Sequence, residues 1–259
     1  DVRPGEGDGA VGGGWIGYLS YPDPGADGTP PRIPEAAGGW TDCVLRLDRN
    51  GTWWYESLSG AALPGWLESA LATRPPEDHC VIDWRMPDAA EHRAGVLSCL
   101  EAIRAGEVYQ ACVCTQFTGT ATGSPLHFFA EAVTRTTPGR AAFLAGDWGA
   151  VASLSPELFL RRNGDRVSSS PMPLHADPDD LRASDKDVAE NIMIVDLVRN
   201  DLGRIAHTGS VTVPELLIVR PAPGVWHLVS TVAAQVPADL ATAGLLAAAF
   251  PPASVTGTP

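Results

Sequence analysis

The spacing of hydrophobic and polar positions changes several times along this chain, and the clearest spacing is helical. From residue 185 to residue 202, apolar side chains recur every three to four positions, as on a helix with one buried stripe. Ser184 with Asp187 three residues later forms a capping box at the start, and Gly203 is a typical helix end. The predicted buried stripe consists of Val188, Ile192, Val195 and Leu202.

Other spacings predict strands. Strand-like runs flank Asn50-Gly51 and Asn163-Gly164, and both dipeptides are strong hairpin signals. Further strands are expected over about residues 107–117, 210–213 and 226–232, and further helices over about 96–105 and 240–250. The order lacks a regular β-α-β alternation. We therefore predict an α+β fold with antiparallel sheets and outer helices.

Proline pairs punctuate the chain before the first long helix. Pro75-Pro76 and Pro87-Asp88 indicate a linker, so we predict a strand-rich N-terminal segment over residues 1–88 and a core over residues 89–259. The first residues contain neither an initiator Met nor a signal peptide, and they resemble the inside of a longer protein.

Composition narrows the class of protein. The net charge is −13 without a Lys/Arg-rich run, which argues against a nucleic-acid partner. No apolar run approaches the roughly 20 residues that span a bilayer, so no membrane partner is expected. The five Cys residues fit no zinc spacing and indicate free thiols in a cytoplasmic protein.

Four side chains are candidates for chemistry. Asp187 and Glu190 lie three residues apart on the predicted helix, so both carboxylates share one face and suit a hard cation such as Mg²⁺. The same spacing also fits an ordinary acidic first turn. Glu157 begins a predicted strand after Ser155-Pro156, and His227 lies in an apolar strand. Either could equally be structural.

Several segments together resemble a known family. Residues 189–204, with the sequence Ala-Glu-Asn-Ile-Met-Ile-Val-Asp-Leu-Val-Arg-Asn-Asp-Leu-Gly-Arg, resemble the signature helix of chorismate-using enzymes. This family includes the large components of aminodeoxychorismate synthase and anthranilate synthase. The resemblance extends from about Gly95 to the end of the chain. Four further segments carry it, namely Tyr109-Gln110, residues 155–160, residues 227–230 and residues 254–259.

The resemblance implies a fold and a set of roles. The fold would have antiparallel sheets packed orthogonally in a sandwich-like core. Glu190 would bind Mg²⁺ with Asp187 beside it, Glu157 would be the acid near the leaving hydroxyl of chorismate, and His227 would lie in the substrate pocket. A substrate carboxylate would be held by three residues near the end of the chain, namely Ser254, Thr256 and Gly257.

The resemblance also implies a reaction. Within the family, the signature helix and the ending Ser-Val-Thr-Gly-Thr-Pro favour amination of chorismate to 4-amino-4-deoxychorismate, a step toward p-aminobenzoate and folate. Ammonia would come from a separate glutamine amidotransferase subunit, which would make a heterodimer. The alternatives are formation of anthranilate by an anthranilate synthase component I and a non-catalytic chorismate-binding fragment.

The chain departs from the family pattern in two places. A Pro-Ile-Lys-Gly-Thr or Pro-Ile-Ala-Gly-Thr stretch is expected after the hairpin that Glu157 begins, but here Pro171 precedes Met172 directly. The Lys of that stretch is the proposed nucleophile of the aminodeoxychorismate branch. The family's C-terminal segment, with further Glu ligands, is also absent after Pro259. We expect both segments in the complete protein.

Overall fold

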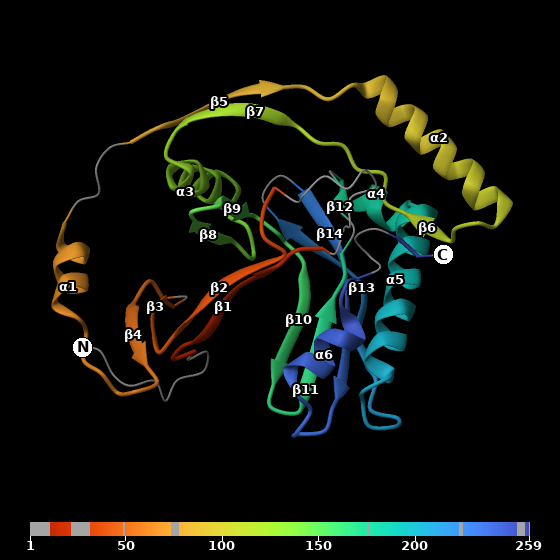
Figure 1. The fold of residues 1–259 in the computed structure, drawn as a ribbon. Helices are drawn as coiled ribbons and strands as arrows, with labels where there is room; N and C mark the ends of the chain where they lie inside the picture. Colours follow the sequence, from red (N-terminus) through yellow and green to blue (C-terminus); the bar gives the residue numbers. More distant parts are fainter. Residues whose placement is uncertain are drawn as a thin grey trace. The chain divides into compact units, whose positions relative to one another are not determined.

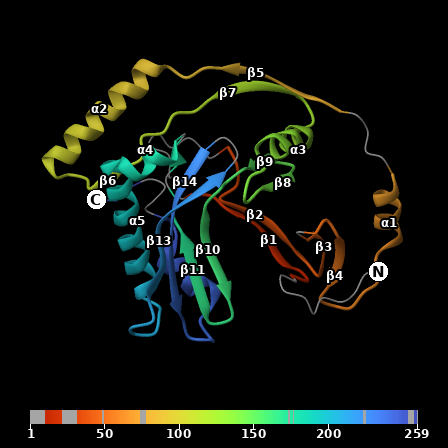
Figure 2. The same ribbon diagram turned by 180° about the vertical axis from the view of Figure 1, so that it is seen from behind.

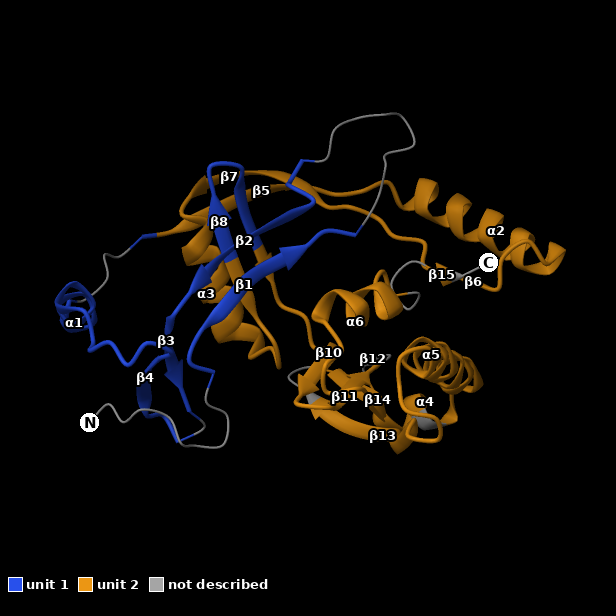
Figure 3. Ribbon diagram, turned by 60° about the horizontal axis from the view of Figure 1, so that its bottom comes forward, with its two compact units in different colours: residues 1–78, 144–151 blue, residues 79–143, 152–259 orange. Residues whose placement is uncertain are grey.

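A computed structural model of residues 1–259 shows how these elements assemble (Figure 1). It describes residues 11–21, 32–48, 50–73, 78–172, 174–175, 177–222, 225–252 and 257–258. The chain divides into two compact units, one of residues 1–78 and 144–151, the other of residues 79–143 and 152–259 (Figure 3). The predicted boundary between Asp88 and Ala89 stays a prediction.

The first unit consists mainly of two antiparallel strand pairs. The hairpin predicted at Asn50-Gly51 is confirmed, since β3 (Cys43–Leu47) pairs with β4 (Trp53–Ser57). Gly51 has a φ of 81°, which suits glycine in a tight turn. The unit also contains β1 (Gly14–Leu19), which pairs with β2 (Ala36–Thr41), and α1 (Gly65–Ala72).

The second unit is built on a five-stranded antiparallel sheet. Its strand order is β10-β11-β14-β12. The long strand β13 also pairs with β14 (Figure 2). The hairpin predicted at Asn163-Gly164 joins β10 to β11 and is confirmed. The sheet strands are β10 (Leu158–Asn163), β11 (Arg166–Ser170), β12 (Leu174–His175), β13 (Thr212–Ala222) and β14 (Val225–Gln235).

The predicted signature helix is α5 (Asp185–Gly203), and it packs along β14 (Figure 1). The Ser184 hydroxyl accepts the Asp187 backbone N–H at 3.1 Å, so the N-terminal cap is confirmed. Side chains from α5, β11, β14 and the following helix form the core. These core residues are Val167, Val195, Leu202, Val232, Ala234, Val236 and Leu245.

The predicted buried stripe of α5 is wrong at one position. Ile192 is 43% exposed, whereas Asn191 is fully buried. Position 191 precedes Val195 by four residues and therefore lies on the same stripe. The polar residue takes this position because its amide finds hydrogen-bond partners on β14. Hydrophobicity alone favoured the neighbouring Ile.

The second unit contains further short strands and helices. The strand predicted over residues 107–117 is wrong, because only β6 (Gln110–Ala111) forms there, paired with β15 (Gly257–Thr258). The helix expected near 240–250 is confirmed as α6 (Thr242–Ala249). The remaining elements of the second unit are β5 (Cys80–Arg85), α2 (Ala89–Ala105), β7 (Thr118–Gly123), α3 (Pro125–Thr136) and α4 (Pro178–Ala183). The strands β8 (Ala142–Gly146) and β9 (Gly149–Ser153) pair with each other, and their residues 144–146 and 149–151 belong to the first unit.

These elements confirm the α+β class with antiparallel sheets. Orthogonal packing of two sheets stays a prediction. Among the residues that the structure describes, no helix is both long enough and apolar enough to cross a membrane.

Candidate active site

The first turns of α5 bring two acidic side chains to one cation. The Lys186 ammonium lies 3.2 Å from Glu190 Oε2 and 3.5 Å from Asp187 Oδ1. The Asp187 side chain is 14% exposed and that of Glu190 is 34% exposed, so both carboxylates are partly shielded from water. The hydrogen bond that Lys186 donates to Glu190 is the main reason that the pKa of Lys186 is raised. This part of α5 therefore attracts positive charge.

This arrangement fits a magnesium site that is completed by other ligands. Mg²⁺ prefers oxygen, and proteins commonly hold it with one or two carboxylates while water and substrate supply the remaining ligands. Asp187 and Glu190 provide such a pair, and they already converge on a cation. Within the described ranges, no group of three or more His, Cys, Asp or Glu side chains gathers as a metal site.

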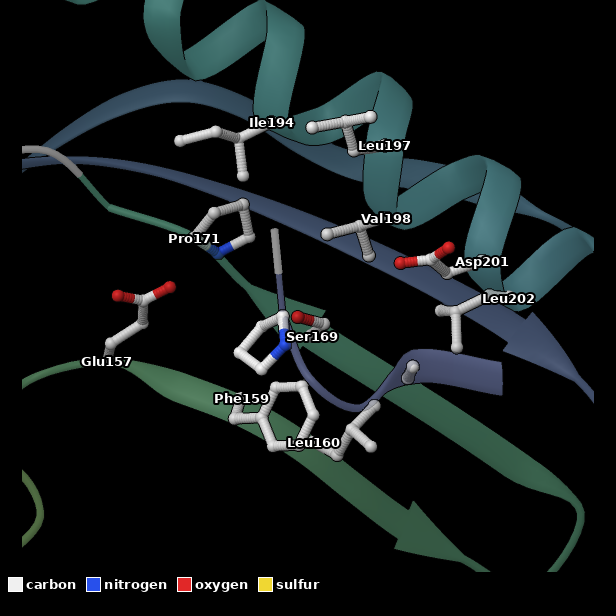
Figure 4. A pocket seen from close by; sticks show the side chains of 12 residues that line it. Glu157, Phe159, Leu160, Ser169, Pro171, Ile194, Leu197, Val198, Asp201 and Leu202 are labelled. Carbon is white, nitrogen blue, oxygen red and sulfur yellow. The ribbon is translucent and has the colours of Figure 1, made fainter. Parts of the chain in front are cut away.

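Glu157 lies at the start of β10 and points into a narrow cavity of about 20 Å³ beneath α5 (Figure 4). Pro171, Ile194 and Leu197 are among the apolar residues that line it. This burial raises the pKa of the Glu157 carboxyl, because the charged form loses hydration. A carboxyl that keeps its proton to higher pH is suited to donate that proton.

His227 lies on β14 and lines a different cavity. This second cavity is open, has a volume of about 600 Å³ and also contains Arg220 and Thr231. His227 is 7% exposed, and burial lowers its pKa, so the neutral imidazole is favoured. Its Nδ1 atom is buried and has no hydrogen-bond partner among the described residues. A neutral ring nitrogen in this state can accept a proton or a hydrogen bond.

The two predicted catalytic residues lie on opposite faces of the sheet. His227 and Thr231 both line the open cavity, so their side chains lie on one face of β14. The Ser230 side chain lies on the other face, because successive side chains of a strand alternate, and it contacts Asn191 on α5. Glu157 lines the cavity on the α5 side. The structure therefore does not gather Glu157 and His227 in one cavity.

The candidate residues nevertheless share one end of the sheet. β11 is antiparallel to both β10 and β14, so β10 and β14 both begin at that end. Glu157 directly precedes β10, and His227 is the third residue of β14. The Asn191 side chain on α5 contacts the backbone of Leu228, which places the first turns of α5 at this end too.

The predicted carboxylate-binding segment is only partly described. Ser254 and Thr256 lie outside the described residues. Gly257 pairs with Ala111, and its φ is +122°. A Cβ at residue 257 would lie 2.2 Å from the backbone oxygen of Gln110, so only glycine fits. Its role toward a substrate stays a prediction.

The segment next to Gly257 approaches α5. The pKa of Cys112 is raised, first by its hydrogen bond with Cys114 and also by the charge of Glu190. The Gln110 side-chain oxygen is buried and has no hydrogen-bond partner among the described residues. The pairing of β6 with β15 therefore brings Gly257 toward the acidic end of α5.

Sequence reasoning missed three residues around this end. Lys186 precedes Glu190 by four residues, and that helical spacing is itself a signal of a side-chain pair. Asn191 and Ser230 are polar residues on buried faces and are hydrogen-bonded to each other. A polar residue at a core position of an otherwise apolar pattern was the available signal.

Comparison with known proteins decides the family. A family model described as chorismate binding enzyme matches residues 3–259. The chain belongs to the chorismate-binding enzyme family. In its fold, the chain is similar to the crystal structure of anthranilate synthase component I from Streptococcus pneumoniae, with a TM-score of 0.76 and 24% identity, over 99% of this chain and 65% of that one.

Two curated relatives in this family carry different names. Aminodeoxychorismate synthase component 1 of Klebsiella aerogenes is 39% identical over 88% of this chain and 53% of its own length. Anthranilate synthase component 1 of Streptomyces coelicolor is 28% identical over 95% of this chain and 57% of its own length. The chain thus spans little more than half the length of these two members of the chorismate-binding family.

Proposed function

We propose that the protein containing this chain converts chorismate and ammonia into 4-amino-4-deoxychorismate and water. The observation that carries this proposal is the pair of carboxylates, Asp187 and Glu190, that converge on a cation at the end of the sheet where Glu157 also lies. Higher identity to the aminodeoxychorismate synthase relative than to the anthranilate synthase relative supports the aminating branch.

Each of these side chains has a task that its environment suits. Glu190, with Asp187 beside it, would hold Mg²⁺, which would neutralise a carboxylate of chorismate and fix its orientation. Glu157 would protonate the hydroxyl group as its C–O bond breaks, so that it leaves as water while ammonia forms the new C–N bond. The raised pKa of Glu157 suits this role.

His227 would act at the ring of the substrate as a neutral side chain. Its lowered pKa leaves it uncharged near neutral pH, and the unpartnered Nδ1 is free to accept a hydrogen bond or a proton. Because Glu157 and His227 line cavities on opposite faces, we place the ring at the shared end of the sheet, where both side chains are in reach. Gly257, with Ser254 and Thr256, would hold a substrate carboxylate at this end.

Ammonia is mostly protonated at neutral pH, so a glutamine amidotransferase subunit would supply it within a cytoplasmic heterodimer. Co-purification with the glutaminase, and glutamine-dependent turnover only after mixing, would support this partner. Glutamine-dependent turnover by the isolated intact protein would refute it.

The products distinguish this proposal from its alternatives. The intact protein, supplied with chorismate, Mg²⁺ and an ammonium salt, is expected to release 4-amino-4-deoxychorismate, which chromatography separates from anthranilate. Formation of anthranilate would instead indicate that the protein is an anthranilate synthase component I. Binding of chorismate without turnover would leave the non-catalytic alternative.

A further inference from the structure

Asn191 on α5 and Ser230 on β14 form a buried polar pair where helix and sheet pack together. Both residues are 0% exposed. The Ser230 hydroxyl donates to Asn191 Oδ1 at 2.5 Å, and Asn191 Nδ2 donates to the carbonyl oxygen of Leu228 at 2.9 Å. Buried polar groups are destabilising when they lack partners, so these bonds favour one relative position of helix and strand.

Ser230 also connects two further segments to this pair. The backbone N–H of Leu217 donates to Ser230 Oγ at 3.0 Å, and the backbone N–H of Ser230 donates to the carbonyl oxygen of Pro171 at 3.2 Å. Leu217 has a φ of 56°, which is uncommon for a residue other than glycine. It lies between Glu215 and Ile218, where the register of β13 shifts. Ser230 therefore holds an irregular strand in place as well as the helix.

Three members of this network lie next to a candidate site residue or its cavity. Asn191 directly follows Glu190, and Leu228 directly follows His227. Pro171 lines the cavity that contains Glu157. The network therefore connects the backbone segments that carry Glu190 and His227, and it also reaches the lining of the cavity that contains Glu157. Neither Asn191 nor Ser230 lines either cavity.

The surrounding apolar contacts would not fix this arrangement alone. Hydrophobic burial is non-directional, so the packing of Val195 against the sheet core tolerates small shifts of α5. A shift by one helical position rotates side chains by about 100°, because the helix has 3.6 residues per turn. Such a shift would carry the Glu190 carboxylate away from its present direction.

We propose that Asn191 and Ser230 are positioning residues that hold Glu190 and His227 in one relative placement. They act through the backbone rather than by contact with substrate. The importance of this placement for turnover rests on the proposed function, whereas the mechanical role of the network does not.

The test compares two alanine variants of β14 in the intact protein. Ser230→Ala removes the two hydrogen bonds of the Ser230 hydroxyl, those with Asn191 and with the Leu217 backbone. Val232→Ala, two residues along on the same face and also 0% exposed, removes only apolar contacts. Mg²⁺ binding by calorimetry is expected to weaken about tenfold or more in Ser230→Ala. Val232→Ala should lower the melting temperature yet bind Mg²⁺ within about twofold of the unmodified protein.

Hydrogen–deuterium exchange gives a readout that is independent of catalysis. Amide exchange across residues 186–192 and 226–229 should accelerate in Ser230→Ala and stay unchanged in Val232→Ala. If the alanine variant does not fold, Ser230→Cys provides the comparison, because it nearly keeps the volume but is a weak donor and acceptor. Equal exchange in the serine variant and the valine control would overturn the positioning role. Absent Mg²⁺ binding by the unmodified protein would refute only the metal proposal, because the exchange data still decide the positioning role.

Discussion

Glu157 and His227 line cavities on opposite faces of the same five-stranded sheet. A small molecule cannot contact both through the sheet, because the strands between them are hydrogen-bonded. Both residues lie where β10 and β14 begin, so their side chains can meet one substrate only around that end. This geometry makes the end of the sheet the place where mutations should affect turnover most.

Glu157→Gln should reduce kcat by about 10²- to 10⁴-fold, because the amide cannot donate the proton that a leaving hydroxyl needs. In the unmodified protein, activity should fall as pH rises through the raised pKa of Glu157, since the acid form disappears. The glutamine variant should lack this fall. Steady-state rates across the pH range check the prediction, and a variant with unchanged kcat would remove Glu157 from the mechanism.

The same substitution should have a pH-dependent effect on stability. Burial raises the pKa of Glu157 in the folded state, so ionisation of this group destabilises the fold as pH rises above the ordinary value of 4.5. At neutral pH, Glu157→Gln should therefore melt at the same or a higher temperature than the unmodified protein. The difference should vanish below about pH 4, where Glu157 is protonated in both states. Thermal melts at several pH values measure this, and a larger difference at low pH would contradict it.

Glu190→Gln should weaken Mg²⁺ binding by about tenfold or more, because it removes the charge while keeping the size. Asp196→Asn is the matched control, since Asp196 lies on the same helix and pairs with Arg199 at the surface. The control should leave the Mg²⁺ dependence of turnover unchanged. Equal behaviour of the two variants would mean that Glu190 is an ordinary acidic residue of the first turns.

Lys186→Gln should strengthen Mg²⁺ binding by a factor of roughly two to five, the scale of an exposed ion pair. The Lys186 ammonium contacts both Asp187 and Glu190. When Mg²⁺ binds these two carboxylates, the ammonium must therefore move away or remain close to a second positive charge. Direct titration of the intact protein with Mg²⁺ measures the effect. Weaker binding in this variant would indicate that Lys186 supports the site and does not compete with the metal.

In a protein in which Met172 directly follows Pro171, as in this sequence, insertion of Ile-Lys-Gly-Thr between them should increase the rate of amination. The segment that follows pairs Leu174 with His227, so the inserted Lys would lie near the same end of the sheet. A Lys there could act as a nucleophile once neutral. Ile-Ala-Gly-Thr at the same site is the control, because it matches the length but lacks the amine. Equal rates for the two insertions would exclude a nucleophilic role.

Local patterns predicted the parts of the fold that local physics decides. Asn163-Gly164 predicted its hairpin because few residues other than glycine and asparagine adopt the required backbone. Ser184 predicted the start of α5 because its hydroxyl satisfies a free backbone N–H. Both features depend on residues within a few positions, so one sequence contained the information.

Features that depend on distant partners were harder to predict. Asn191 displaced Ile192 from the buried stripe because Leu228 and Ser230, almost 40 residues later, supply hydrogen bonds. The separation of Glu157 from His227 depends on which face of the sheet each side chain occupies. The register shift between Leu158 and Arg161 in β10 interrupts the regular alternation of faces next to Glu157. The resemblance named the candidate residues, but the sequence could not assign them to faces.

The pairing of Gly257 with Ala111 has a consequence for the order of folding. This two-residue contact closes a loop that runs from residue 111 to residue 257, whereas β13 and β14 pair with neighbours in the chain. Closure of a long loop carries an entropic cost, and only two residues on each side compensate for it. The segment that approaches Glu190 should therefore dock late during folding and detach first under mild denaturant.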